Sequence, residues 1–282
     1  MRELEFTVGA EETGQTALTF LRRRGVSRRS ITKLKASGGI TRGGEVLRTV
    51  DKVSEGDKVT VFVGDKSSGV ILPNSDIKAA VAFEDDDVIV FDKPPFLPVH
   101  PSIKHSTDTL ANLFAAMFPD TVFRSVNRLD RNTSGLCVCA KNRLAAPKLA
   151  KSISKTYFAV VDGIIEGSGE IDLPIGRMGD SIIKRAVRQD GQSAVTCYKA
   201  VRHNNGRTLL EITLKTGRTH QIRVHFAHIG YPLCGDDMYG GDCSAIGRQA
   251  LHCGRAEFSQ PVTGERISLE SELPKDIRSL IE

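Results

Sequence analysis

Aromatic side chains are scarce in this chain of 282 residues, which has no tryptophan and only four tyrosines. No apolar run reaches the roughly 18 residues that a membrane-spanning helix needs, so we expect no membrane partner. The first twenty residues contain no basic segment followed by an apolar stretch, so we expect no secretory signal and a cytoplasmic location. The hydrophobic content of 40% predicts one large folded domain, or one large and one small.

The six cysteines include no Cys-x-x-Cys pair. In a cytosolic chain this spacing favours small, half-buried side chains over disulfides or a metal centre. Three histidines, His220, His225 and His228, lie in one stretch without an acidic neighbour. The five-residue step between the first two places them on different faces of a helix, so we expect no metal site.

Acidic residues are absent from residues 13–44, although the chain contains 34 of them. The same stretch holds eight positive charges: Arg22, Arg23, Arg24, Arg28, Arg29, Lys33, Lys35 and Arg42. A basic block this concentrated predicts a polyanionic partner, most simply nucleic acid. The alternative is a solvated helical face.

The basic block also has a structural pattern. "TALTFLRRRG" has helical spacing of apolar residues and a stop signal at Gly25. "SRRSITKLKASGG" predicts a second helix that begins after an N-cap at Ser27 and ends at Gly38–Gly39. Alternating short strands follow up to residue 63, so the pattern predicts two small helices followed by a small sheet.

This arrangement resembles the alpha-L RNA-binding module named after a ribosomal small-subunit protein, from roughly Gly14 to Val63. The matching features are "GVSRRS", "GGITRGGEVL" and "VSEGDKVTV". The family usually has Val-Asn-Gly where this chain has Thr41-Arg42-Gly43, which adds a cation. The resemblance implies RNA contacts from cations of the two helices: Arg22, Arg28, Arg29, Lys33 and Lys35. We expect this module to span residues 1–65 and a mobile linker to span residues 66–76.

Residues 77–282 mix short strands and helices without a sustained β-α-β alternation. This pattern predicts an α+β fold, built on a mainly antiparallel mixed sheet with flanking helices. Two apolar strands are expected around the acidic turn of residues 85–87, followed by a proline-rich loop.

The stretch "SVNRLDRNTSGLCVCAKN" places Asp130 in a turn directly before an apolar strand. A carboxylate there is supported by a rigid element, as a catalytic group should be. The flanking Arg128 and Arg131 favour its ionised form. The alternative is a turn aspartate that caps its own backbone.

Two further features follow along the chain. "TYFAVVDGII" predicts a strand that Tyr157 opens; its ring is either core packing or a stacking platform for a base. "GRTHQIRVHFAHIGYP" predicts a helix with Thr219 as N-cap, an apolar stripe, and Arg223 at the edge of that stripe.

Taken in order, these pieces closely resemble the RluA-type RNA pseudouridine synthase family, from about Ala82 to Pro274. The motifs are "FEDDDVIVFDKPPFLPVHPS", "NRLDRNTSGLCVCAKN", "KTYFAVVDG", "GRTHQIRVHFAHIGYPLCGDDMYGG" and "RQALHCGRAEFSQPVTGE". An alpha-L module in front of the catalytic domain is common in that family. One position departs from the pattern, because the family usually has histidine where this chain has Asn127.

The resemblance implies that the chain isomerises uridine to pseudouridine in RNA without a metal or cofactor. Asp130 would be the catalytic carboxylate, attacking the sugar or stabilising the departing base. Arg223 would pair with it, and Arg128 would hold the RNA open. Tyr157 would stack on the uracil, with assistance in proton transfer as a further role. Large-subunit ribosomal RNA is the favoured substrate and transfer RNA the second, with a monomer as the expected form. A catalytically silent RNA-binding or ribosome-assembly factor is the competing hypothesis, favoured only by Asn127.

Overall fold

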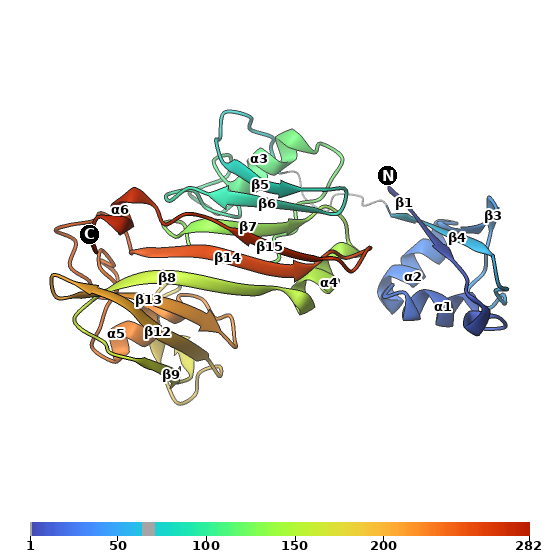
Figure 1. The fold of residues 1–282 in the computed structure, drawn as a ribbon. Coiled ribbons are helices and arrows are strands. Elements are labelled where there is room, and N and C mark those ends of the chain that lie inside the picture. The colour runs from blue at the N-terminus through green and yellow to red at the C-terminus, as the bar shows by residue number, and fades with distance from the viewer. Residues whose placement is uncertain (1, 64–70) are drawn as a thin grey trace.

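The computed structural model describes residues 2–63 and 71–282, which form two main sheets with separate hydrophobic cores (Figure 1). Residues 66–70 of the predicted linker lie outside the described residues, and residues 71–76 form no helix or strand. No helix of the described ranges has the length and apolar character needed to cross a bilayer.

The N-terminal part is a four-stranded antiparallel sheet with two helices packed on it. Its strands follow the order β1-β4-β2-β3. The elements are β1 (Arg2–Thr7), the 3-10 helix η1 (Ala10–Glu12), α1 (Ala17–Arg23), α2 (Arg28–Ala36), β2 (Ile40–Arg42), β3 (Glu45–Val46) and β4 (Lys58–Val63).

The two helices form where the sequence predicts them. The Ser27 side chain accepts a hydrogen bond from the Ser30 backbone N–H, so it caps α2 as expected. Gly25 has φ of +80° directly after α1, a conformation that ends a helix at little cost for glycine. The sequence reading missed β1, which pairs with β4 along its whole length and adds a strand in front of the helices.

The larger part is a nine-stranded mixed sheet with helices on its faces, which confirms the α+β prediction. The strand order is β5-β6-β7-β14-β8-β13-β12-β9, and β15 pairs with β14 (Figure 1). The first elements are β5 (Ala80–Glu84), β6 (Val88–Lys93), α3 (Leu110–Met117), β7 (Ser134–Ala140), α4 (Ala145–Ser152), β8 (Ser154–Asp162) and β9 (Ser168–Asp172). The remaining ones are β10 (Ile175–Arg177), β11 (Arg185–Val187), β12 (Val195–Asn204), β13 (Arg207–Leu214), α5 (Gln221–His228), β14 (Leu251–Ser259), β15 (Arg266–Glu270) and α6 (Lys275–Arg278).

The centre of this sheet supports the Asp130 turn. Strand β7 is buried at every position, because β6 and β14 flank it and both of its faces are covered. The β7–β14 pair is parallel, whereas the other ladders of this sheet are antiparallel. Gly135 has φ of +105°, and an added Cβ would lie 2.3 Å from the Cys253 carbonyl oxygen. Only glycine therefore allows β14 to approach the start of β7 this closely.

The two parts touch at the N-terminal end of α4. Leu144 is 5% exposed and packs into the core of the N-terminal part. Lys148 passes directly over Gly25, where an added Cβ would meet its Cε at 2.5 Å. Its ammonium donates a hydrogen bond to the Pro261 carbonyl. The α1–α2 turn therefore rests on α4.

Candidate active site

The predicted catalytic turn opens into a cleft of about 920 Å³. Asp130 lines it, with its side chain 26% exposed. The Thr133 backbone N–H donates to the Asp130 carbonyl, which closes the turn just before β7. The turn is therefore anchored at its C-terminal end to a fully buried strand.

Asn127 holds the other end of the turn. Its side-chain amide donates to the Leu136 carbonyl at 3.0 Å and accepts from the Val138 backbone N–H at 2.8 Å. The side chain thus makes the two hydrogen bonds that a neighbouring strand would make with β7. Asn127 therefore has a structural role at the start of the turn.

Three buried side chains bind the turn from below. The Lys93 ammonium donates to the carbonyls of Pro94, Leu97 and Arg131. Arg248 donates to the Asn132 carbonyl, and Gln249 donates to the Thr133 hydroxyl. Consecutive residues 131, 132 and 133 each receive one of these bonds, so the turn is held at a fixed height above the sheet.

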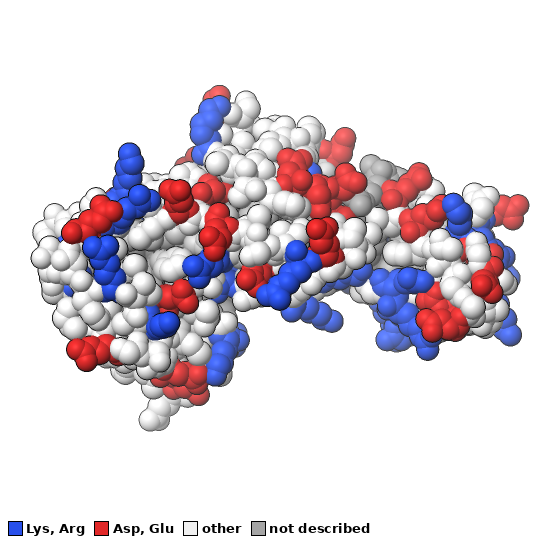
Figure 2. All heavy atoms as spheres, viewed as in Figure 1, with Lys and Arg blue, Asp and Glu red and all other residues white. Residues whose placement is uncertain are grey.

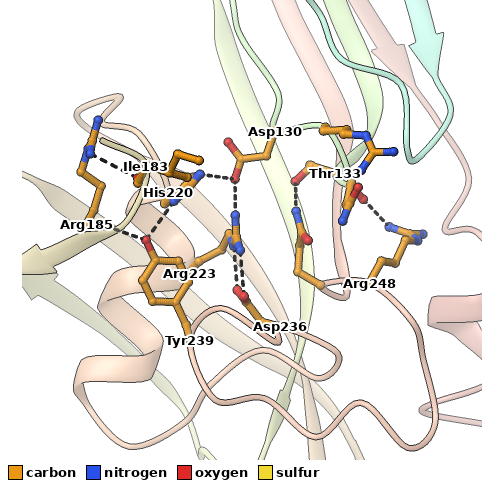
Figure 3. Close-up of polar contacts among 12 residues, drawn as sticks. Asp130, Thr133, Ile183, Arg185, His220, Arg223, Asp236, Tyr239 and Arg248 are labelled. Carbon is orange, nitrogen blue, oxygen red and sulfur yellow. Dashed lines mark hydrogen bonds and ion pairs between the residues drawn. The ribbon is translucent and has the colours of Figure 1, made fainter. Parts of the chain in front are cut away.

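Arg223 joins Asp130 to a second carboxylate (Figure 3). Its Nη1 lies 3.0 Å from Asp130 Oδ2. Its Nε and Nη2 bind the two oxygens of the fully buried Asp236 at 2.6 and 2.8 Å. Burial opposes the charge on Arg223, but the two carboxylates outweigh it and raise the pKa of the guanidinium above its ordinary value. Asp236 therefore orients the arginine that holds Asp130.

Helix α5, which carries Arg223, begins at Gln221, so its N-cap lies one residue later than predicted. The cap residue of α5 is His220 and not Thr219, and His220 makes no side-chain cap. The side chain of Gln221 instead fixes the turn before the helix, because it accepts from the Arg218 backbone N–H and from the Thr216 hydroxyl.

His220 enters the cleft from this helix start (Figure 3). Its Nε2 lies 3.8 Å from Asp130 Oδ2, and its Nδ1 lies 2.9 Å from the Tyr239 hydroxyl. The other two histidines lie elsewhere: His225 binds Thr196 and the Leu173 carbonyl, and His228 is exposed. Across the described residues, no group of three or more His, Cys, Asp or Glu side chains could hold a metal ion.

Tyr157 forms part of the cleft wall from β8. It is 6% exposed, between Ile212 of β13 and Cys253 of β14. Burial, followed by the nearby Cys253 and Asp130, raises the pKa of its hydroxyl well above the ordinary value. The side chain therefore presents an aromatic surface and a protonated hydroxyl.

Positive charge dominates the described part of the cleft. Asp130 is the only carboxylate among the described lining residues. Seven lysines and arginines line it with Asp130: Arg128, Arg131, Lys155, Arg185, Lys215, Arg218 and Arg223. Arg128 and Arg131 are exposed on either side of Asp130. Such a lining suits a polyanion that delivers one group to a single carboxylate.

A second group of cations lies on the N-terminal helices. Figure 2 shows lysine and arginine side chains gathered over α1 and α2. The five residues predicted to bind RNA are all exposed, and none forms an ion pair with another described residue: Arg22, Arg28, Arg29, Lys33 and Lys35. Ile31 and Leu34 of the same helix are buried, so the charged face of α2 points away from the core.

The structure places the predicted Asp130, Arg223, Tyr157 and Arg128 around one cleft. It adds three neighbours that sequence reasoning missed, His220, Asp236 and Tyr239. Asp236 and Tyr239 lie in "GDDMYGG", where an acidic residue and a tyrosine between glycines gave a visible signal. The pairing itself depends on how the loop after α5 folds back under the helix. His220 was weighed only as a metal ligand.

Known proteins are similar to this chain over most of its length. The family model described as RNA pseudouridylate synthase matches residues 87–228. An uncharacterised RNA pseudouridine synthase of Bacillus subtilis, YjbO, is 38% identical over 91% of this chain and 95% of its own length. Ribosomal large subunit pseudouridine synthase D of Pseudomonas aeruginosa is 37% identical over 99% of this chain and 93% of its own length.

A solved structure shows the same fold. Human RNA pseudouridylate synthase domain containing 1 superposes with a TM-score of 0.59 over 71% of this chain and 85% of that chain, at 24% identity. The family match covers half of the chain, and the bacterial relatives match nearly all of it at more than one third identity. The chain therefore belongs to the RNA pseudouridylate synthase family, isomerases that convert uridine to pseudouridine in RNA.

Proposed function

We propose that this chain isomerises uridines of large-subunit ribosomal RNA, with Asp130 as its catalytic carboxylate. The observation that carries the proposal is the single carboxylate in a cleft whose described lining includes seven cations. The substrate is inferred from the Pseudomonas aeruginosa relative, whose name assigns it to the large ribosomal subunit. Asn127, the one feature that favoured a silent RNA-binding factor, binds β7 through its side chain.

The reaction begins with the target uridine leaving its stack. Flipping a base costs roughly a few kcal/mol, which contacts in the protein must offset. We infer that the ring of Tyr157 packs against the flipped uracil. Arg128, exposed at the rim beside Asp130, holds the RNA open where the base has left.

Asp130 then acts at the sugar. As the C1′–N1 bond breaks, its electron pair leaves with the base and positive charge develops at C1′. The carboxylate of Asp130 meets that charge, and Arg223 keeps it in place. The uracil turns, C5 bonds to C1′, and the proton on C5 is lost while N1 gains one, so product and substrate have the same atoms.

We also propose that different parts of the chain have different functions. Residues 1–65 form the RNA-binding unit, residues 66–76 join it to the rest, and residues 77–282 carry out the reaction. The separate cores and the exposed cations of α1 and α2 support this division. We further propose that a monomer acts, in the cytoplasm where ribosomal RNA is processed.

Pseudouridine mapping tests the substrate. Total RNA from cells with and without this chain is treated with a carbodiimide that stops reverse transcription at pseudouridine. We expect one or a few stops in large-subunit ribosomal RNA to disappear and to return with the wild-type chain. Loss of stops in transfer RNA alone would replace the proposed substrate with transfer RNA.

Substitution of Asp130 tests the residue. Asp130→Asn keeps the size of the side chain and removes its charge, so we expect no restored stops and a thermal melt close to wild type. Full restoration by this variant would overturn the assignment of Asp130.

A further inference from the structure

His220 has an unusual backbone conformation at the edge of the cleft. Its φ and ψ are 58° and 19°, the left-handed region that non-glycine residues seldom adopt. Such strain costs on the order of 1 kcal/mol or more and persists where the surrounding structure imposes it. Here the conformation brings the imidazole, 10% exposed, between Tyr239 and Asp130.

The partners of Tyr239 determine which nitrogen of His220 carries the proton. The backbone N–H of Arg185 donates to the Tyr239 hydroxyl oxygen at 3.0 Å. The hydroxyl hydrogen is then free to point at His220 Nδ1, 2.9 Å away. Burial raises the pKa of Tyr239, so the hydroxyl keeps this hydrogen. With Nδ1 accepting, the proton of the neutral imidazole lies on Nε2.

Nε2 faces the oxygen of Asp130 that Arg223 already binds. Arg223 Nη1 is 3.0 Å from Oδ2, and His220 Nε2 is 3.8 Å from the same atom. Hydrogen bonds in free enzymes are often longer than in the complex with substrate, so 3.8 Å is within reach of closure. No described residue donates a hydrogen bond to Oδ1 of Asp130.

We propose that His220 is a positioning residue for the pseudouridine reaction. As a neutral imidazole held by Tyr239, it donates Nε2–H to Oδ2 of Asp130 and, with Arg223, turns Oδ1 toward C1′ of the flipped uridine. This inference rests on the proposed role of Asp130.

The charges around His220 are consistent with a neutral ring. Burial lowers the pKa of His220, and the cations Arg223 and Arg185 act in the same direction. Asp130 and Asp236 act in the opposite direction, and the Tyr239 hydroxyl is the remaining group that faces the ring. A second proton would bind to Nδ1, which could then no longer accept the hydrogen bond from the Tyr239 hydroxyl. The step should therefore slow as the pH falls through the pKa of His220.

Single-turnover release of tritium tests the proposal. The substrate is total RNA labelled with 5-tritiated uridine, taken from cells that lack this chain, so it contains the target whichever RNA that is. His220→Asn is the informative variant, because asparagine tolerates the left-handed backbone and still reaches Tyr239, but is too short to reach Asp130. We expect its rate constant to fall on the order of 100-fold, the effect of a displaced catalytic group, with RNA affinity unchanged.

Three further variants separate positioning from folding. His220→Gln places an amide near the position of Nε2 and should recover part of the rate. Tyr239→Phe removes only the hydroxyl and should lower the rate without displacing the ring. His228→Asn, in the exposed last turn of the same helix, should match wild type. Because glutamine does not titrate, the ratio of wild-type to His220→Gln rates should fall as the pH drops below about 6.5, the ordinary pKa of histidine, since burial lowers the pKa of His220.

The proposal would be overturned if His220→Asn and Tyr239→Phe both react within twofold of the wild-type rate. It would also be overturned if the ratio of wild-type to His220→Gln rates does not change with pH. Failure of the proposed function gives a different result. In that case the wild-type chain would release no tritium, or Asp130→Asn would release it at the wild-type rate.

Discussion

The buried hydroxyl of Tyr157 has a testable role separate from that of its ring. Because burial raises its pKa well above the ordinary value, the side chain enters the reaction as a neutral phenol. Tyr157→Phe keeps the aromatic surface and removes the hydroxyl, which could exchange a proton with the base. We expect RNA affinity to stay near wild type and the single-turnover rate to fall by about 100-fold, typical of a lost proton-transfer group.

Tyr157→Leu provides the comparison, because it removes the ring as well. This variant should lose both affinity for the flipped base and rate. If Tyr157→Phe reacts at the wild-type rate while Tyr157→Leu does not, the hydroxyl has no part in catalysis and only the ring matters.

Lys93 predicts a pH dependence of stability. Burial lowers its pKa to about 8, whereas an unfolded chain keeps this proton until about pH 10.5. Between these values the unfolded state binds more protons than the folded state, so the free energy of unfolding rises with pH. Relative to Lys93→Met, the wild-type chain should gain up to about 3 kcal/mol across this range. Denaturant unfolding at several pH values measures the difference.

Lys104→Met is the matched control, because Lys104 is an exposed lysine near the same loop. The difference between wild type and this control should not change with pH. A flat difference for Lys93→Met as well would show that the three carbonyl acceptors of Lys93 hold its proton as firmly as water does.

Local sequence was sufficient to single out the residues that we propose act directly, and the structure places them in one cleft. The charged turn before an apolar strand indicated Asp130, and helical spacing placed Arg223 at the edge of a stripe. Asp236 could not be paired with Arg223 in the same way, because the contact spans 13 residues and a chain reversal. Such pairs follow from tertiary structure and not from periodicity.

At the scale of elements, the sequence predicted which segments form helices. It predicted less well the residues at which helices begin and the strands that pair. The sequence predicts Thr219 as the N-cap of α5, yet the cap residue is His220, whose side chain caps no N–H group. Strand β1 was missed although Leu4 and Phe6 alternate with charged residues, because a strand at the N-terminus needs β4, more than fifty residues away, to form a ladder.

The short C-terminal helix α6 predicts an effect on the catalytic turn. Asp276 binds Arg248 through both oxygens at 2.7 and 2.9 Å, and Arg248 donates to the Asn132 carbonyl two residues after Asp130. Asp276→Asn removes the charge that fixes the guanidinium. We expect the single-turnover rate to fall by about tenfold, because a shifted turn misplaces Asp130, with little change in RNA affinity.

Glu272→Gln serves as the control for that experiment, since Glu272 precedes the same helix and its side chain is 94% exposed. It should leave both rate and affinity unchanged. An equal effect of the two substitutions, or none from Asp276→Asn, would show that α6 does not position the turn.

At the scale of the whole molecule, the α+β class followed from the sequence but the strand order did not. Strand β14 lies between β7 and β8, although about ninety residues separate β8 from β14 in the sequence. The strands on either side of it, β7 and β8, lie close together in the sequence and are joined through α4. Local alternation cannot show that a late strand inserts between two early ones, because register depends on burial in the assembled sheet.

The cations of α2 predict how the N-terminal part contributes to RNA binding. Reversal of Arg28, Arg29 and Lys33 to glutamate removes three exposed charges without touching the buried Ile31 and Leu34. Each phosphate contact contributes roughly 0.7 to 0.9 to the slope of log affinity against log salt concentration. We therefore expect weaker binding at low salt and a slope reduced by about 2 to 3. Filter binding over a salt series measures both.

A charge-matched variant distinguishes this contact from a general electrostatic effect. Reversal of Lys199, Arg202 and Lys275 changes the net charge equally, but these exposed residues lie on β12 and α6 in the larger part of the molecule. If α2 binds the RNA directly, this control should reduce affinity far less and keep the wild-type slope. Equal losses in the two variants would mean that net charge alone matters, and unchanged affinity of the α2 variant at low salt would mean that residues 77–282 bind the substrate alone.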